Sequence, residues 1–386
     1  MEKSYLSKHV SNLKPSGIRR FFEIAATMKE VISLGIGEPD FDSPQPVIDA
    51  GIQSLHQNET HYTSNRGLLP LREALCDHIE NLYAVKYDPH TEVVFTVGGS
   101  EALNVACAAI LDPGDEVILP TPCFVSYQGV ISLAGGTPVE VPSRMENSFL
   151  PDPDELENAV TDKTKAILLN FPSNPTGAVA DRDTLIAIGR IAEKYDLVVI
   201  SDEIYDRLVY GEDHVCFSAL PGMRERTILI GGFSKDYAMT GWRIGFACAP
   251  EGIMRGIARV HQYIIMTAPT MAQYGALAAL QSCEPDVLHM VQEYDRRRKL
   301  IVQGLNYIGL PTFEPHGAFY AFPRVEVTGL DGDAFAERLL HEKHVAVVPG
   351  SAFGPGGEGF VRCSYATAFD QIEEALDRID QFVKSL

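Results

Sequence analysis

The chain has 386 residues, of which 45% are apolar and 22% charged, and its formal net charge is −20. This length predicts two domains, and the composition is typical of a globular protein rather than a disordered or fibrous one. The negative charge argues against nucleic acid or an anionic membrane as a partner, because both would be repelled over much of the surface.

The cysteines and the N-terminus indicate the cellular compartment of the protein. The seven cysteines are scattered, and none forms a C-x-x-C pair. They are typical of small core residues in a reducing environment, so neither disulfides nor a metal site are expected. No apolar run approaches the roughly 18 residues that a membrane span needs, and the N-terminus predicts no secretory signal. We therefore expect a cytoplasmic protein.

The middle of the chain alternates short β-rich runs with longer helical patterns. The runs are EVVFTV (92–97), DEVILP (115–120), KAILLNF (165–171), DLVVIS (196–201) and TILIGGF (227–233). Residues 183–195 place Leu185, Ile188 and Ile191 on one helical face. Apolar strands separated by amphipathic helices predict an α/β fold with a mostly parallel sheet covered on both faces. We assign this large domain to residues 46–285.

The last hundred residues predict a smaller α+β domain. A long charged helix is expected at 286–307, followed by short strands in GAFYAFP, VAVVPG and FVRCSYA. A closing helix is predicted from four apolar residues on one face, Ile372, Leu376, Ile379 and Val383. The N-terminal segment cannot bury itself alone, so this domain comprises residues 1–45 and 286–386.

Chemically distinctive residues follow the ends of the predicted strands. They are Gly98-Gly99-Ser100-Glu101, Phe124, Asn174, Asp202 with Tyr205, and Ser234-Lys235. In open α/β sheets, ligands bind outside the carboxyl ends of the strands. We therefore expect these side chains to gather in one crevice.

Three of these motifs also suit purely structural roles. TVGGSEAL opens a helix whose first N–H groups favour an anion, but it equally suits a simple turn, and its spacing fits neither a dinucleotide site nor a P-loop. SNPTG (173–177) is typical of an Asn-Pro turn. Asp202 either caps the next helix or holds a proton on a heterocyclic nitrogen.

The segment GGFSKDYAMTGWRIG (231–245) is the most informative. Lys235 directly follows an apolar strand, so it should enter the crevice instead of open solvent, and Arg243 follows eight residues later. Buried lysines are rare unless they are paired or reactive, and a desolvated lysine can serve as an amine nucleophile. An ion pair with an acidic neighbour is the alternative.

Together these motifs resemble the fold-type-I pyridoxal-phosphate aminotransferases of class I/II, and among them the prokaryotic aspartate and aromatic aminotransferases. The matching segments run in order from GIGEPDFDSP through HYTSNRG, VGGSEAL, PTPCFVSY, SNPTG, SDEIYD, FSKDYAMTGWRIG and HGAFY to VVPGSAF and VRCSYA. The resemblance implies the PLP-transferase fold, with a seven-stranded sheet in the large domain, and pyridoxal 5'-phosphate as the cofactor.

The resemblance also implies a role for each residue that contacts the cofactor ring. Lys235 would form the Schiff base and transfer protons, and Asp202 would pair with the protonated pyridine nitrogen. Asn174 and Tyr205 would hydrogen-bond the phenolic oxygen. Phe124 would stack on the ring face.

The resemblance also implies which residues bind the phosphate and the substrate. The phosphate would be held by the backbone amides of Ser100 and Glu101, together with Ser234 and Arg243. Tyr62 would reach the phosphate of a neighbouring subunit, which implies a homodimer with composite sites, or else is an ordinary interface aromatic. Arg362 would grip the substrate α-carboxylate bidentately, or else forms a salt bridge on the strand surface. Gly37, Phe124 and Asn174 would complete the substrate site, and domain closure could exclude water.

The implied activity is a ping-pong transfer of an amino group from an L-amino acid to a 2-oxo acid such as 2-oxoglutarate. The segments PSGIRRFFEIA, PTPCFVSY and VVPGSAFGPGGEGF favour an aromatic amino acid, and no second arginine for a side-chain carboxylate can be recognised. Ile18, Phe21 and Tyr263 are candidate apolar contacts to its side chain, although each equally suits the core. Aspartate, alanine and N-acetyl-diaminopimelate aminotransferases share the motifs. A C–S lyase and a regulatory protein that keeps a cofactor fold are the alternatives from other classes.

Overall fold

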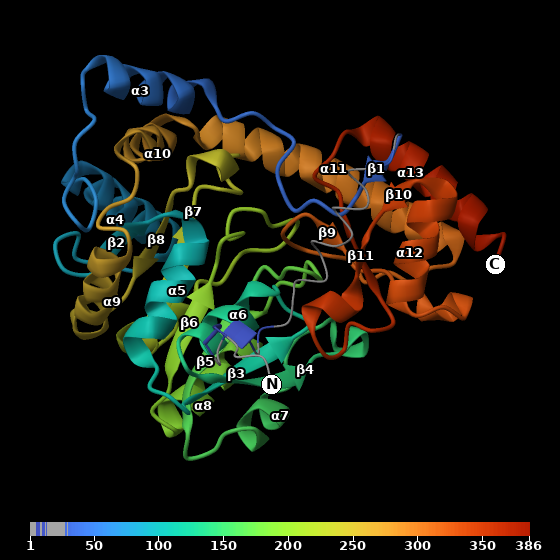
Figure 1. Cartoon of the computed structure of the whole chain (residues 1–386), viewed down its shortest axis with the longest axis horizontal. Coiled ribbons are helices and arrows are strands. Elements are labelled where there is room, and N and C mark those ends of the chain that lie inside the picture. Colours follow the sequence, from blue (N-terminus) through green and yellow to red (C-terminus); the bar gives the residue numbers. More distant parts are fainter. Residues whose placement is uncertain (1–4, 8–9, 12, 14–27, 29) are drawn as a thin grey trace.

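The computed structural model describes residues 5–7, 10–11, 13, 28 and 30–386 (Figure 1). Ile18 and Phe21 lie outside the described residues. The strands are β1 (Ile32–Ser33), β2 (Val93–Thr96), β3 (Glu116–Thr121), β4 (Thr137–Pro142), β5 (Thr164–Asn170), β6 (Val198–Asp202), β7 (Thr227–Gly232), β8 (Gly245–Cys248), β9 (Tyr320–Ala321), β10 (Val345–Ala346), β11 (Val348–Pro349) and β12 (Val361–Ser364). The α-helices are α3 (Gln45–His56), α4 (Leu69–Tyr83), α5 (Gly98–Ile110), α6 (Ser126–Leu133), α7 (Pro153–Asn158), α8 (Arg182–Lys194), α9 (Glu251–Ile264), α10 (Thr270–Ser282), α11 (Glu284–Ile308), α12 (Gly332–Lys343) and α13 (Phe369–Val383).

A seven-stranded sheet in the order β2-β8-β7-β6-β5-β3-β4 forms the centre of the larger body. β8 runs antiparallel to β2 and β7, and the other neighbouring pairs are parallel. The predicted α/β fold with a mostly parallel sheet is confirmed. Because β2, β3, β5, β6 and β7 share one direction, their carboxyl ends meet at one edge of the sheet.

Both faces of the sheet are covered, as the apolar runs predict. Successive side chains of a strand point to opposite faces. In β5, Ala166 and Leu168 join the core that contains residues of α5, α6 and α9. Ile167 and Leu169 join the opposite core, with α8. Residues of α4 and α10 cover that second face near β2 and β8.

Five of the seven strands coincide with the predicted runs, whereas β4 and β8 were not predicted. β4 is the edge strand, so most of its residues are partly exposed and they form no continuous apolar run. β8 has only four residues and begins two positions after Arg243. The predicted helix at 183–195 is α8, and the Asp181 side chain caps it by accepting a hydrogen bond from the Thr184 amide at 2.8 Å.

The C-terminal region forms a second, smaller body, to which α11 leads from α10 (Figure 1). β11, β12 and β9 form an antiparallel sheet, and β1 pairs in parallel with β10. The predicted strand VAVVPG is therefore divided at Val347 between two sheets. Three of the four predicted apolar residues of α13 are buried, and Val383 is partly buried. The domain boundaries at 45/46 and 285/286 stay a prediction.

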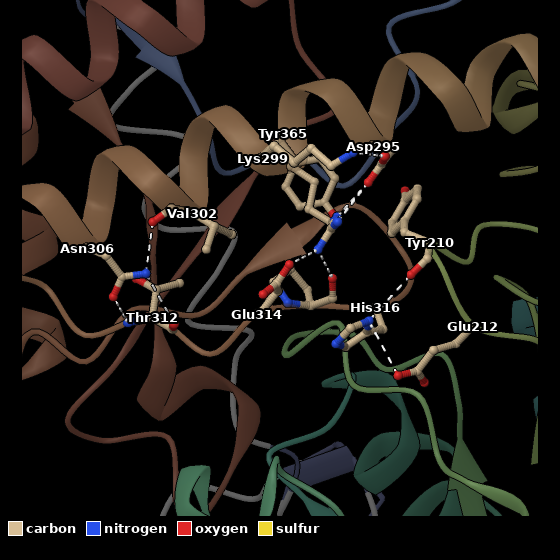
Figure 2. A network of polar contacts seen from close by, with 12 residues as sticks. Tyr210, Glu212, Asp295, Lys299, Val302, Asn306, Thr312, Glu314, His316 and Tyr365 are labelled. Atoms are coloured by element: carbon tan, nitrogen blue, oxygen red, sulfur yellow. Dashed lines mark hydrogen bonds and ion pairs between the residues drawn. The ribbon is translucent and has the colours of Figure 1, made fainter.

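Polar contacts join α11 to the segment before β9, and that segment to the loop after β6 (Figure 2). The buried Arg298 of α11 donates to Asp295 at 2.9 Å and to Glu314 at 2.8 Å. Beyond this pair, the His316 ring lies 3.5 Å from a carboxylate oxygen of Glu212, which belongs to the segment after β6. This network joins the C-terminal body to the loop that leaves the sheet. Among the helices of the described residues, none is long and apolar enough to cross a membrane.

Candidate active site

A cavity of about 810 Å³ lies at the carboxyl edge of the large sheet. Ten of the predicted site residues line it, namely Gly37, Ser100, Phe124, Asn174, Asp202, Tyr205, Ser234, Lys235, Arg243 and Arg362. Most of them follow the carboxyl ends of β3, β5, β6 and β7, as the topology requires. Arg362 comes from β12 and Gly37 from the loop after β1, so the smaller body supplies the opposite wall.

Lys235 follows β7 and carries an amine into this cavity. Its Nζ donates a 2.7 Å hydrogen bond to the carbonyl oxygen of Gly37. Burial lowers the pKa of the amine to about 8, against a raising effect from the charge of Glu38, and the charges of Arg362 and Arg243 lower it further. In the described part of the chain the amine forms no ion pair. Lys235 therefore has the environment of a reactive amine and not that of a structural ion pair.

Asp202, the last residue of β6, supplies a buried carboxylate. Its Oδ2 accepts a 2.8 Å hydrogen bond from the Tyr127 hydroxyl, and its Oδ1 accepts one of 3.2 Å from the Ile204 amide. Burial raises the pKa of Asp202 to about 6, although both hydrogen bonds act to lower it. No α-helix follows directly, so Asp202 is not a helix cap, and its carboxylate is available to a group in the cavity.

Arg362 presents a buried guanidinium to the same cavity. The residue is only 4% exposed, and its nitrogens donate to Asn174 Oδ1 at 2.8 Å and to the Gly35 carbonyl at 2.6 Å. The Nε atom is buried without a hydrogen-bond partner, and burial lowers the pKa of the group. The alternative of a strand-surface salt bridge is wrong, because the side chain is inside and is balanced by neutral oxygens. A buried cation of this kind suits an anionic ligand.

The first turn of α5 and Arg243 form a second wall that suits an anion. Gly98 has a φ of +71°, and a Cβ atom on it would lie 2.6 Å from Nη2 of Arg243. Glycine thus lets the guanidinium rest against the start of the helix, where unpaired amides favour negative charge. Arg243 itself adopts a φ of +56°, which a non-glycine residue seldom does. Ser100 and Ser234 line the cavity here as well.

Two tyrosines in the site were not singled out from the sequence. Tyr127 binds Asp202, and Tyr320 shares a 2.8 Å hydrogen bond with the hydroxyl of Tyr205. The Tyr320 ring also lies against Arg362, with the guanidinium carbon 4.4 Å from the ring centre. Both occur within the motifs PTPCFVSY and HGAFY, but a local pattern does not reveal which aromatic side chain faces the crevice.

Three predicted residues do not line the cavity. The Glu101 side chain turns away, with one oxygen 2.7 Å from Nδ1 of the buried His261, so the predicted contact of its backbone amide stays a prediction. Tyr62 is 79% exposed on the surface. Tyr263 is 86% exposed near the end of α9, so the prediction that it contacts the substrate or the core is wrong within this chain. Its side chain lies on the outward face of α9.

Comparison with known proteins identifies the family to which the chain belongs. The profile described as aminotransferase class I and II matches residues 29–379. The chain belongs to the class I and II aminotransferases. It is 47% identical to an aspartate aminotransferase of Pyrococcus abyssi and 45% identical to the aromatic-amino-acid aminotransferase 2 of Thermococcus litoralis, over 98% of each chain in both cases. The solved structure of a Thermus thermophilus aspartate aminotransferase with maleate superimposes with a TM-score of 0.94 at 38% identity, covering 98% of this chain and 100% of the other.

The chain is accordingly a pyridoxal-phosphate-dependent transaminase. The groups in the cavity of this aminotransferase fit that cofactor. The phosphate matches the wall of Arg243 and the first turn of α5, an aldehyde matches the amine of Lys235, and a protonated ring nitrogen matches the carboxylate of Asp202.

Proposed function

We propose that Lys235 binds the cofactor covalently and also moves the proton during transfer of the amino group. The observation that carries this proposal is the Lys235 amine itself, which lies in the cavity with its pKa lowered by burial. A neutral amine can attack an aldehyde, and after its release by the substrate it can take the proton from the substrate Cα.

We propose that Asp202 holds the proton of the cofactor ring nitrogen. When bound, the cofactor draws electron density away from the substrate Cα. A cationic partner would restore the carboxylate form of Asp202, since burial alone raises its pKa to about 6. Tyr127 orients this carboxylate through its 2.8 Å hydrogen bond. Phe124 would stack on the ring, and Asn174 and Tyr205 would contact its phenolic oxygen.

We propose that Arg362 binds the α-carboxylate of the substrate. Neutral oxygens of Asn174 and Gly35 fix two of its nitrogens, while Nε has no partner. An anchored guanidinium would orient the Cα–H bond toward the amine of Lys235. Because Arg362 and Gly37 come from the smaller body, substrate binding would also draw the two bodies together and exclude water.

We propose an aromatic amino acid as the donor. Among the described residues, the basic side chains that line the cavity are Lys235, Arg243 and Arg362, and each already has a role. No further cation of these residues is placed to bind a side-chain carboxylate. The aliphatic and aromatic side chains of the lining are Val31, Ile36, Leu103, Phe124, Tyr127, Ile204, Tyr205 and Tyr320. These walls favour an apolar side chain over a carboxylate.

We also propose a cytoplasmic homodimer in which Tyr62 reaches the neighbouring subunit's phosphate. The segment that contains Tyr62 contacts a group of exposed apolar residues at the end of α9, since Asn65 donates a 2.6 Å hydrogen bond to the carbonyl of Met266. The exposed members of this group are Tyr263, Ile264, Ile265 and Met266. Apolar side chains gathered on a surface are typical of an interaction site.

The role of Lys235 is tested by borohydride reduction of the native enzyme followed by peptide mapping. The label should appear on the peptide that contains Lys235. Lys235→Ala should abolish transamination while the folded state survives, and Lys235→Arg is the matched control that keeps a cation. A label on another lysine, or transamination by the alanine variant, would exclude the assignment.

The donor is tested with purified enzyme, 2-oxoglutarate and a panel of amino acids, with the oxo-acid products identified. The proposal expects a higher kcat/KM for phenylalanine and tyrosine than for aspartate and alanine. A preference for aspartate would contradict it. Release of pyruvate and ammonia from cystathionine without an oxo acid would instead indicate a lyase side activity.

A further inference from the structure

Two aspartates lie together behind the site, next in sequence to two of its functional residues. Asp206 follows Tyr205, and Asp236 follows Lys235. Asp236 is only 4% exposed. Both line a second cavity of about 30 Å³, and neither lines the larger one. These carboxyl groups therefore face away from cofactor and substrate.

Two basic groups near this small cavity, Arg207 and His214, already have partners, and burial lowers the pKa of a third, His78. The titratable groups around Asp236 are His78 and Tyr83 of α4, Glu203, Asp206 and Arg207 after β6, Tyr237 after β7, and Glu284 of α11. Arg207 donates two hydrogen bonds to the carboxylate of Glu284, at 3.0 and 2.5 Å. The His214 ring lies 2.6 Å from an oxygen of Glu203. The charge of Arg207 acts on both aspartates, but its side-chain hydrogen bonds go to Glu284, so Asp206 is the hydrogen-bond partner that remains for Asp236.

The hydrogen bonding of the two aspartates is unequal. Asp206 accepts a 2.6 Å hydrogen bond from the hydroxyl of Tyr83. Asp236 has one buried oxygen without any partner. Burial raises the pKa of Asp236 well above its usual range, and the charge of Asp206 together with a hydrogen bond between the two side chains raises it further, whereas the charge of Arg207 acts to lower it. Two such close carboxyls cannot both ionise without water around them.

We propose that the carboxyl group of Asp236 stays protonated and donates a hydrogen bond to the carboxylate of Asp206. This hydrogen bond positions the segment after β7 against the segment after β6. The bond would hold the backbones of Lys235 and Tyr205 in a fixed relation from behind the site. This inference rests on the proposed roles of Lys235 and Tyr205. Asp206 and Asp236 are positioning residues, because neither touches the cofactor cavity.

The proton on Asp236 is tested by the pH dependence of thermal unfolding. A carboxyl whose pKa is raised by folding makes the protein less stable as the pH rises above about 4, its value in the unfolded chain. Asp236→Asn cannot ionise and still donates a hydrogen bond. The Tm of this variant minus that of the wild-type holoenzyme should therefore increase by roughly 2 °C or more between pH 5 and pH 8.

Asp286→Asn, at an exposed position, is the matched control and should show no such trend. A difference for Asp236→Asn that is as independent of pH as the control would overturn the proposal.

The positioning role is tested by comparing a donor-keeping with a donor-lacking variant. Asp236→Ala should lower kcat/KM at least ~10-fold and shift the pH midpoint of the absorbance change of the bound cofactor. Asp236→Asn should restore both toward the wild type. Equal losses in the two variants would overturn the proposal.

A second variant keeps the proposal testable if Asp236→Ala does not fold. Asp206→Asn removes the neighbouring charge, so in this background the Tm change caused by Asp236→Asn should depend less on pH than it does in the wild type. An undiminished dependence would mean that Asp206 does not hold the proton on Asp236. The unfolding measurements do not depend on where borohydride places its label, so a failure of the Lys235 assignment is recognised separately.

Discussion

The hydroxyl of Tyr127 lies 2.8 Å from Oδ2 of Asp202, and both side chains are buried. Tyr127 belongs to the first turn of α6 and Asp202 to the end of β6, so the contact joins two segments that are distant in sequence. The donated hydrogen bond favours the ionised form of a carboxyl group whose pKa is raised by burial. The hydrogen bond from Tyr127 therefore influences the fraction of Asp202 that is ionised near neutral pH, when the cofactor ring is bound.

Tyr127→Phe removes that hydrogen bond without changing the shape of the ring. The pKa of Asp202 should rise further, so the acid limb of kcat/KM should move to higher pH by ~1, and cofactor affinity should fall by ~10-fold or more. Fluorescence titration of the apoprotein with cofactor between pH 6 and pH 8 measures the affinity. Tyr195→Phe is the matched control, because the exposed Tyr195 donates to Glu157 at 2.9 Å and neither residue lines the cavity. Unchanged affinity at pH 6 would show that Tyr127 does not act on the carboxylate.

Lys235→Met should stabilise the apoprotein while it removes activity. Folding lowers the pKa of Lys235 from 10.5 to about 8, mainly by burial. Below pH 8 the amine is charged in both the folded and the unfolded chain, so the folded state bears the full cost of a buried charge. Between pH 8 and pH 10.5 this cost disappears as the folded protein loses the proton.

The Tm of Lys235→Met apoprotein should thus exceed that of the wild-type apoprotein by roughly 2 °C or more at pH 7, and the gain should shrink as the pH approaches 10. Scanning calorimetry over this pH range provides the measurement. Lys163→Met, at an exposed lysine, should show no comparable trend. A gain that grows with pH would mean that the buried amine is not the source.

The strand ends could be predicted from the sequence, whereas the directions of several side chains could not. Lys235 and Asp202 were found because each follows an apolar run, and the parallel topology brings such positions to one edge. Arg362 was found only through the resemblance of FVRCSYA to the family, since it lies on β12 in the antiparallel sheet of the smaller body. Tyr320 could not be found in this way, since its direction depends on how β9 packs against β12. The edge strand β4 was missed because its partly exposed residues lack the apolar run that marks the central strands.

Glu101 and Tyr263 were singled out from the sequence, but their side chains do not reach the cavity. Glu101 lies in the segment VGGSEAL and Tyr263 near the end of α9, yet Glu101 turns to His261 and Tyr263 points outward. A helix presents its side chains in all directions, so tertiary contacts decide which of them reaches a ligand. The family motifs locate the loops of the site, but they do not fix these directions.

Gly37→Ala should disturb the tyrosine pair at the boundary between the two bodies. A Cβ atom at Gly37 would lie 2.3 Å from the hydroxyl oxygen of Tyr320, which is buried and bonded to Tyr205. The Tyr320 ring cannot move without breaking that bond, and a displacement of about 1 Å can cost ~100-fold in rate. We expect a loss of kcat/KM of this order, measured at saturating cofactor. Gly252→Ala is the matched control, because a Cβ there meets nothing within 4 Å. Full activity of Gly37→Ala would show that the tyrosine pair tolerates displacement.

Arg362→Lys tests whether the buried guanidinium selects the substrate carboxylate. The Arg362 side chain is held by Asn174 and Gly35 in a fixed plane, and its Nε atom is unpartnered. Lysine keeps the positive charge but has a single nitrogen, which cannot hold these two oxygens and also bind a carboxylate bidentately. We expect kcat/KM to fall by ~100-fold for the amino acid and for the oxo acid alike, because both carry the same α-carboxylate. Cofactor affinity should stay near that of the wild type.

Steady-state kinetics in both directions measure kcat/KM for the two substrates, and titration of the apoprotein measures the cofactor affinity. Arg324→Lys, at a partly exposed arginine paired with Glu146, is the matched control. A loss confined to one of the two substrates would mean that Arg362 recognises something other than the group they share.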